Sequence, residues 1–203
     1  MRYIKDYLEN LIEIKKSKFI CQVYRVNNTD EVLNILTSVR KKYYDARHNC
    51  YAYIIGDNME IMKSSDDGEP QKTAGYPMME ALKKYEVTNI LVIVTRYFGG
   101  TLLGASGLIH AYSSSVHEAL SKCKFYVKKN LEEILIQTDY KGYNQIIKMP
   151  NVNIIDQKFL DYVILRVGLD GVSFDSFCET LEEMHITKEI KKIGDFQVEI
   201  PID

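Results

Sequence analysis

The sequence predicts an α+β protein made of two domains. Segments in which apolar and polar residues alternate, as in strands, are interspersed with segments whose apolar residues recur at helical spacing. The charge also changes along the chain: residues 1–129 hold 19 Lys and Arg against 14 Asp and Glu (net +5), and residues 130–203 hold 7 against 14 (net −7). This asymmetry indicates two modules with different surfaces, and we place the domain boundary between residues 129 and 130.

In the first domain, alternation predicts a strand over residues 17–26, and Thr29 is the expected cap of a helix that starts at Asp30. No element is assigned before Ser17. After this helix we expect strands 49–55 and 59–63 joined by a turn at Gly56, then a polar loop 64–75 and a helix 77–85. A strand 89–95 that is apolar on both faces is expected next. It is followed by a glycine-rich loop, a helix 108–121 and a strand 124–127.

The second domain reads as strand, helix, two strands, helix and strand. The expected strands are 132–138, 152–159, 162–169 and 197–200, and the second and third of them form a hairpin. The expected helices are 140–148 and 174–184. This β-α-β-β-α-β order is that of ferredoxin-like domains. A short linker is expected near residues 128–131.

Composition narrows the classes of function. No apolar run approaches 18 residues, and the N-terminal segment mixes charges with apolar residues, so we expect neither a membrane span nor a signal peptide and infer a cytoplasmic protein. The four cysteines are far apart and form no CxxC pair, which predicts reduced, buried thiols rather than disulfides or a zinc site. We expect no cofactor and no membrane partner.

The stretch VIVTRYFGGTLLGASG (92–107) is the most informative in the chain. A strand runs into a loop that is rich in glycine, and a helix is expected to follow from Gly107. Backbone amides at Gly99 and Gly100 and at the helix start would hold an anion, with Arg96 as a bidentate phosphate partner. The stretch lacks both GxxxxGK[ST] and GxGxxG, so an ordinary nucleotide fold is unsupported.

The aromatic residues of this loop have two interpretations. Tyr97 and Phe98 would stack on bases, as aromatic side chains do in proteins that bind single-stranded nucleic acid. Alternatively, the loop is a tight turn that places both rings in the core. The sequence leaves both open.

There are two further polar clusters. Asp45–Cys50 leads into a predicted strand, and Ser65–Gly75 follows one. His48 with Asp66, Asp67 and Glu69 offers ligands for a divalent ion, although the spacing matches no narrow template, and an acidic turn often only holds its own backbone. His48 is also the best candidate for acid–base chemistry, because its ordinary pKa lies near neutrality. A structural role for this histidine is the alternative.

Four segments taken together strongly resemble the IMPACT family, and the resemblance spans about residues 15–128. The segments are ARHNCYAY, DDGEP…TAGYPM, TNILVIVTRYFGG and LLGASGL. The resemblance implies a first domain with the fold shared by a small-subunit ribosomal protein, the GHMP kinases and domain IV of elongation factor G. It implies a second domain similar to the ferredoxin-like domains of that factor. Eukaryotic relatives regulate translation through an additional N-terminal domain without counterpart in this sequence, so their role is not carried over. Bacterial members look like nucleic-acid or ribosome binders.

The resemblance and the motifs together select the expected site. The predicted nucleic-acid or phosphate contacts are Arg47, His48, Lys72, Arg96, Gly99, Gly100 and Gly104, and the accompanying motif loop comprises Asp66, Asp67, Gly68, Glu69, Thr73 and Gly75; no metal ligand is assigned. The chain departs from the family pattern at Leu102 and His110, where relatives usually carry Lys and Arg. Each lost cation would weaken phosphate binding.

Three functions follow as hypotheses. The first is a non-enzymatic, cytoplasmic protein that binds RNA or the ribosome, as a translation-related regulator. The second is a metal-assisted phosphoryl-transfer or small-molecule enzyme that uses His48 with Asp67 or Glu69. The third is a regulator that binds a protein partner and in which the polar motifs are structural.

Overall fold

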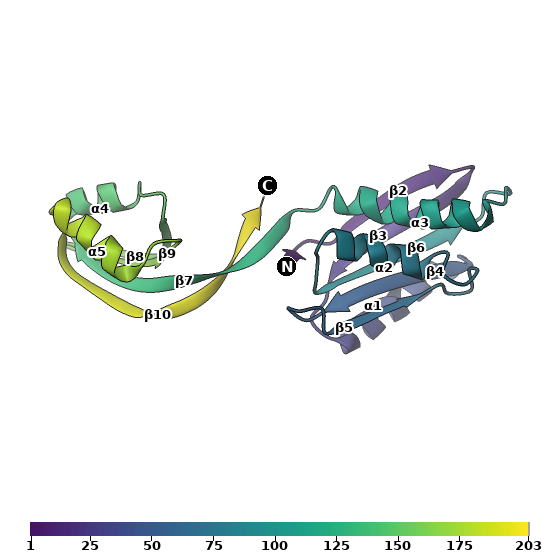
Figure 1. Cartoon of the computed structure of the whole chain (residues 1–203), viewed down its shortest axis with the longest axis horizontal. Helices are drawn as coiled ribbons and strands as arrows, with labels where there is room; N and C mark the ends of the chain where they lie inside the picture. Colours follow the sequence, from purple (N-terminus) through teal and green to yellow (C-terminus); the bar gives the residue numbers. More distant parts are fainter. Residues whose placement is uncertain (203) are drawn as a thin grey trace. The chain divides into compact units, whose positions relative to one another are not determined.

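The computed structural model describes residues 1–202, with the backbone alone at residues 187 and 188. The chain forms two compact units (Figure 1). Unit 1 comprises Met1–Val127 together with Pro201 and Ile202, and unit 2 comprises Lys128–Ile200. The division between them falls two residues before the boundary expected from the sequence.

Unit 1 is built on a sheet of five antiparallel strands in the order β2-β3-β6-β4-β5. The strands are β2 (Leu8–Ile14), β3 (Ser17–Arg25), β4 (His48–Ile55), β5 (Ile61–Ser65) and β6 (Ile90–Tyr97). Helix α1 (Thr29–Lys42) packs on one face, and helices α2 (Gly75–Lys84) and α3 (Gly104–Leu120) pack on the other (Figure 1).

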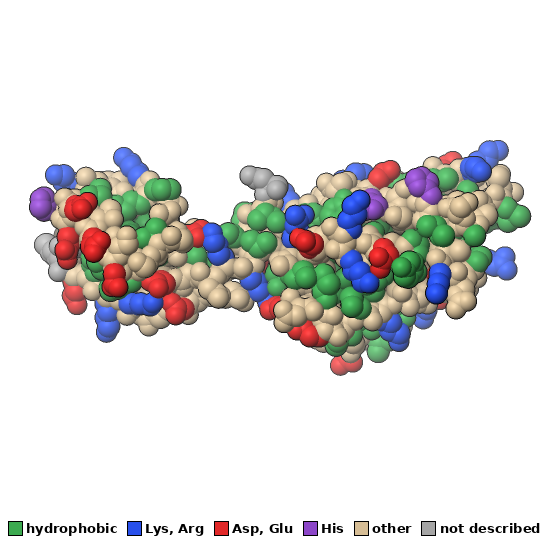
Figure 2. Space-filling view, viewed as in Figure 1, with side chains coloured by type: hydrophobic (Ala, Val, Ile, Leu, Met, Phe, Trp, Pro, Cys, Tyr) green, Lys and Arg blue, Asp and Glu red, His purple; other side chains and the backbone are tan. Residues whose placement is uncertain are grey.

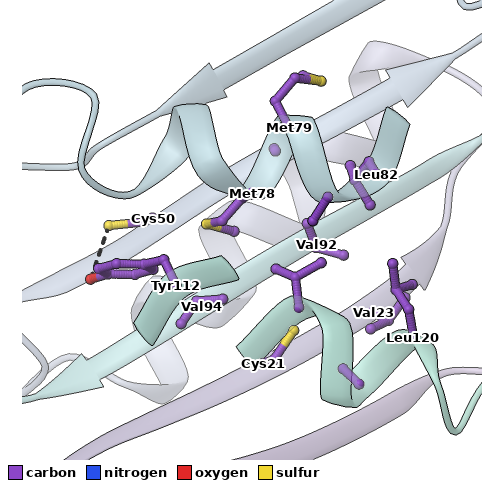
Figure 3. Packing of buried hydrophobic residues seen from close by; sticks show 14 of the residues in the cluster. Cys21, Val23, Cys50, Met78, Met79, Leu82, Val92, Val94, Tyr112 and Leu120 are labelled. Atoms are coloured by element: carbon purple, nitrogen blue, oxygen red, sulfur yellow. Dashed lines mark hydrogen bonds between the residues drawn. The ribbon is translucent and has the colours of Figure 1, made fainter. Parts of the chain in front are cut away.

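The central strand β6 explains these layers. Successive side chains of a strand point to opposite faces, so an apolar run packs on both. Val92 and Val94 join the cluster beneath α2 and α3, where Met78 and Leu120 also lie (Figure 3), and Ile93 joins the cluster beneath α1. The expectation of a central strand that is apolar on both faces is confirmed.

Several expected bounds in unit 1 were wrong. Two strands, β1 (Arg2–Ile4) and β2, lie in the N-terminal segment where none was expected. The cap of α1 is Asn28 rather than Thr29, because the Asn28 side chain accepts a hydrogen bond from the Glu31 amide. Helix α3 begins at Gly104, four residues before the start of the expected helix 108–121.

Unit 2 has the expected β-α-β-β-α-β order. Its elements are β7 (Phe125–Thr138), α4 (Tyr140–Ile146), β8 (Val152–Phe159), β9 (Val163–Leu169), α5 (Phe174–Glu183) and β10 (Thr187–Ile202), and its strands pair in the order β10-β7-β9-β8. The residues expected as a linker, 128–131, lie inside β7, whose first residues pair with β1 in unit 1. Strand β10 begins ten residues before the expected one. Within the described residues, no helix is both long and apolar enough to cross a membrane.

Candidate functional site

Antiparallel pairing brings the three polar segments of the sequence to one end of the unit 1 sheet. His48, the first residue of β4, lies opposite Arg96 near the end of β6. Strand β5 pairs with β4 and leads into the loop of residues 66–74. The backbone oxygen of Asp67 in that loop lies 2.8 Å from Nδ1 of His48. One end of the sheet therefore collects the motifs that the sequence singled out.

Asp66 organises the loop before α2. One of its carboxylate oxygens accepts hydrogen bonds from the amides of Ala74 and Gly75, both at 2.9 Å, and the other accepts from the Lys72 amide at 2.8 Å. These bonds satisfy backbone donors at a helix start that has no other side-chain cap. A Cβ at Gly75 would lie 2.7 Å from the Ser65 backbone nitrogen, so only glycine fits there. Asp66 is thus a scaffold residue.

The next residues of this motif loop also hold the backbone together. The Asp67 carboxylate accepts from the Asn49 amide at 2.7 Å and from the Arg40 guanidinium at 3.0 Å. The buried Thr73 hydroxyl donates to the Pro70 carbonyl at 2.7 Å. Gly68 has φ +86°, and a Cβ at this position would lie 3.3 Å from Nδ1 of His48. The loop is therefore internally bonded, and it fixes the ring of His48.

A buried polar cluster lies beneath this loop. Nη1 of Arg96 donates to Oε1 of Glu69 at 2.6 Å, and the Tyr112 hydroxyl donates to the same oxygen at 2.8 Å. The Cys50 sulfur lies 3.3 Å from the Tyr112 oxygen (Figure 3). Burial raises the pKa of Cys50 to about 12 and raises that of Tyr112 still further above its ordinary value. Neither group is ionised near neutral pH, which argues against either as a nucleophile.

Arg96 is placed differently from the simple phosphate ligand that the sequence suggested. Only 7% of the residue is exposed, and its charge is paired with that of Glu69. The guanidinium carbon lies 5.5 Å from the ring centre of Phe19 and 5.7 Å from that of Phe98. Its buried Nε has no hydrogen-bond partner within the described structure. Arg96 thus supports the loop from below, and it also lines a pocket together with Arg47 and His48.

The glycine loop is pressed against the turn between β2 and β3. The Gly99 amide donates to the Ser17 hydroxyl at 3.1 Å, and a Cβ at Gly99 would lie 2.0 Å from the Lys16 carbonyl carbon. Gly100 and Gly104 have φ +85° and +70°, where side chains are strained, and neither is crowded. The loop therefore leaves the sheet in one fixed direction and carries Phe98 outward.

Phe98 is shared by two pockets at the sheet end. One, of about 220 Å³, is lined by Arg47, His48, Arg96, Phe98 and Leu102; the other, of about 440 Å³, is lined by Leu11, Lys16, Lys18, Ile20, Tyr97 and Phe98. We call the residues of both pockets the Phe98 surface. Phe98 is 56% exposed, which rules out the interpretation that both loop aromatics lie in the core.

The Phe98 surface is basic. Arg47, Lys16 and Lys18 are exposed, and none forms an ion pair within residues 1–202. Carboxylates also belong to this neighbourhood: Asp45 accepts the Tyr97 hydroxyl at 2.8 Å, Glu13 lies opposite Lys18 in the pairing of β2 with β3, and Glu69 is paired with Arg96. Lys16 and Lys18 were not expected at this site from the sequence, although a KKSK run between two alternating segments is a signal for a basic hairpin turn.

Lys72 lies on another surface. It lines a groove of about 360 Å³ between α2 and α3 together with Tyr76, Lys84, Ile109 and His117, among others, and it lines neither pocket of the Phe98 surface. At the two positions where the family pattern has cations, Leu102 is 85% exposed beside Phe98, and His110 is exposed on α3. The sequence had grouped Lys72 with Arg47 and Arg96.

The carboxylates considered as metal ligands are already bonded. Asp66 and Asp67 accept backbone amides, and Glu69 is paired with Arg96. In the described part of the chain, no group of three or more His, Cys, Asp or Glu side chains could hold a metal ion. The arrangement gives the metal-assisted hypothesis no ready ligand set.

Comparisons with known proteins agree with this fold and these motifs. The model of the Impact N-terminal domain matches residues 15–120. The chain is 43% identical to the IMPACT family member YvyE of Bacillus subtilis over 143 residues, which cover 70% of this chain. The matched segment spans 66% of YvyE, slightly less than two thirds of its length. It is 35% identical to the IMPACT family member YigZ of Escherichia coli over 84% of this chain and 86% of that one.

A solved structure supports the same assignment. The crystal structure of a hypothetical protein, 31% identical, matches with a TM-score of 0.61 and covers 95% of this chain and 96% of that one. The motifs and the family model thus agree over unit 1, the relative YigZ and the solved structure extend over most of the chain, and the chain belongs to the IMPACT family.

Proposed function

We propose that this protein is a non-enzymatic, cytoplasmic, translation-related binding protein that contacts RNA, free or in the ribosome, through the Phe98 surface. The observation that carries the proposal is the set of three cations, Arg47, Lys16 and Lys18, that surround an exposed aromatic ring without ion-pair partners in the described structure. Unpaired cations attract the phosphate backbone and release its counterions on binding.

Further features of unit 1 support an anionic ligand. Helix α3 begins two residues after Leu102, and its first turn has neither a side-chain cap nor an acidic residue. The free amides at the start of a helix favour negative charge nearby. The net charge of +5 over residues 1–129 acts in the same direction at longer range.

The fold types belong to the same proposal. The sheet of unit 1, with α1 on one face and α2 and α3 on the other, is compatible with the domain shared by a ribosomal protein, GHMP kinases and domain IV of elongation factor G. The strand order β10-β7-β9-β8 in unit 2 is compatible with a ferredoxin-like domain. Both likenesses would suit a protein that works beside RNA.

The enzymatic alternative is less well supported. Small-molecule sites usually enclose about 300–1,000 Å³. The pocket beside His48 has about 220 Å³, and the larger pocket, about 440 Å³, is lined by apolar, aromatic and lysine side chains and by no His, Asp or Glu among the described residues. The Cys50 thiol and the Tyr112 hydroxyl are held in their protonated forms, as described above. These features favour surface binding over turnover.

Replacing Arg47 by alanine tests the proposal. Because Arg47 is exposed and unpaired, the variant should fold normally and bind structured RNA more weakly at low salt. Losing one phosphate contact should reduce the slope of log K against log salt by about 0.7–0.9. Fluorescence anisotropy over a series of salt concentrations measures both quantities, and co-sedimentation with ribosomes tests the larger partner.

Lys63→Ala provides the matched control. Lys63 is exposed on β5 and lines neither pocket, so its removal changes the net charge equally without touching the Phe98 surface. Absence of RNA binding at micromolar protein would refute the proposal. Equal effects of Arg47→Ala and Lys63→Ala would also refute it, because binding would then follow net charge alone.

A protein partner is the second candidate function, and the α2–α3 groove favours it. Tyr76 is 55% exposed and Ile109 is 43% exposed in this groove. Figure 2 shows hydrophobic and basic side chains close together over these helices. We expect Ile109→Asp to abolish capture of a partner that survives nuclease treatment and to leave RNA binding unchanged. If every captured protein is lost on nuclease treatment, the groove has no partner of its own.

A further inference from the structure

The Phe98 ring has a cation close to it and is largely exposed. The Arg96 guanidinium lies over the ring, 5.7 Å from its centre, and is itself fixed by the 2.6 Å bond to Glu69. Phe98 is nevertheless 56% exposed, so much of the ring is accessible to a ligand. An exposed ring fixed in this way is a preformed surface for stacking.

Tyr97 does not share this role. Its hydroxyl is bonded to Asp45, and desolvation together with that bond raises its pKa to about 12. The side chain is half-buried and belongs to the sheet surface at Lys18, its neighbour across β3 and β6. Of the two aromatic residues of this loop, Phe98 is therefore the more exposed, and it lines both pockets.

The cations lie on both sides of Phe98. Arg47 lines the pocket on one side, and Lys16 and Lys18 line the pocket on the other, while the ring belongs to both. A nucleic-acid strand whose backbone crossed this surface would place a phosphate near each group and a base at the ring. A double helix cannot present a base in this way, because its bases are already stacked and paired.

From this arrangement, and resting on the proposed function, we infer that the Phe98 surface binds an unpaired segment of RNA, with one base stacked on Phe98 and the flanking phosphates held by Arg47 and by Lys16 with Lys18. Unpaired loops, bulges and ends of a folded RNA are the substrate class. Because every base has an aromatic face, the contact is tolerant of sequence.

The test compares an oligouridylate of about 12 nucleotides, a length within the range of known single-strand sites, with an RNA duplex of equal length. We expect the single strand to bind more tightly. One stacked base typically contributes enough that Phe98→Ala should weaken single-strand binding by about 5- to 100-fold. Duplex binding should change less than about twofold, because it rests on the cations.

Two further variants control for shape and folding. Phe98→Tyr keeps the ring and should retain most of the single-strand affinity, whereas Phe98→Leu keeps bulk without an aromatic face and should lose it. Ile61→Ala removes an exposed apolar side chain of β5 that lines neither pocket of the Phe98 surface and should have little effect. Thermal unfolding of each variant confirms that the domain is intact.

The outcomes separate the two proposals. If single strand and duplex bind equally, or if Phe98→Ala weakens both to the same extent, the stacking inference is overturned while the proposed RNA binding stands. If Phe98→Leu binds as well as Phe98→Tyr, the aromatic face is not used and the inference fails as well. If neither RNA binds, both proposals are refuted.

Discussion

Replacing Glu69 by alanine should destabilise unit 1 by about 3–5 kcal/mol, the cost typical of removing one partner from a buried ion pair. The reason is the position of Arg96, whose side chain is only 8% exposed and whose charge is balanced by Glu69 at 2.6 Å. Without the carboxylate, the guanidinium would remain as an uncompensated buried charge. The Tyr112 hydroxyl would lose its acceptor as well.

Urea denaturation followed by circular dichroism measures this loss. Glu69→Gln should fall between the native protein and Glu69→Ala, because an amide oxygen can still accept from Arg96 and Tyr112 but carries no charge. The double variant Glu69→Leu with Arg96→Met should recover much of the stability, since an apolar pair leaves no uncompensated charge. Such recovery would show that the loss comes from the orphaned cation rather than from lost packing.

An exposed pair in the same unit provides the control. Lys83 and Glu80 form a 3.0 Å ion pair on the surface of α2, with 45% and 47% of their side chains exposed. Breaking it by Glu80→Ala should cost at most about 0.5 kcal/mol, because water screens exposed charges and helical pairs at this spacing contribute little. If Glu69→Ala is as mild as Glu80→Ala, the buried pair is not what holds the loop to the sheet.

The secondary structure was most predictable where periodicity was strong. The apolar run of β6 and the helical spacing of α1 gave these elements directly, because burial of a strand or helix face leaves a regular pattern. The N-terminal strands escaped detection, since β2 mixes charges with apolar residues and packs one face only. The start of α3 at Gly104 was missed because glycine signals loops more often than helix starts.

The composition of the site was predictable, and its arrangement was not. The motifs identified His48, Arg96 and the acidic loop as belonging together, and antiparallel pairing does bring them to one sheet end. Nothing in the local sequence says that Glu69 would neutralise Arg96, because that bond spans 27 positions in the chain. Long-range packing likewise decides that Lys16, rather than Lys72, lies beside Phe98.

Replacing Gly99 by alanine should displace the loop that carries Phe98. The added Cβ would lie 2.0 Å from the Lys16 carbonyl carbon and 2.3 Å from the Ser17 nitrogen. These are backbone atoms, which cannot rotate away, so the loop must separate from the β2–β3 turn and lose the bond to the Ser17 hydroxyl. Overpacking of this kind typically costs about 1–3 kcal/mol.

The binding consequence distinguishes this change from ordinary destabilisation. At a temperature where the variant is still folded, Gly99→Ala should weaken single-stranded RNA binding as strongly as Phe98→Ala, because the ring and the cation at Lys16 are displaced together. Gly194→Ala, where a Cβ would meet nothing within 4 Å, should change neither stability nor binding by more than about 0.5 kcal/mol. If the folded Gly99→Ala protein binds RNA with full affinity, the loop does not need its close contact with the β2–β3 turn to reach the ligand. In that case the geometry of the loop is not what positions Phe98.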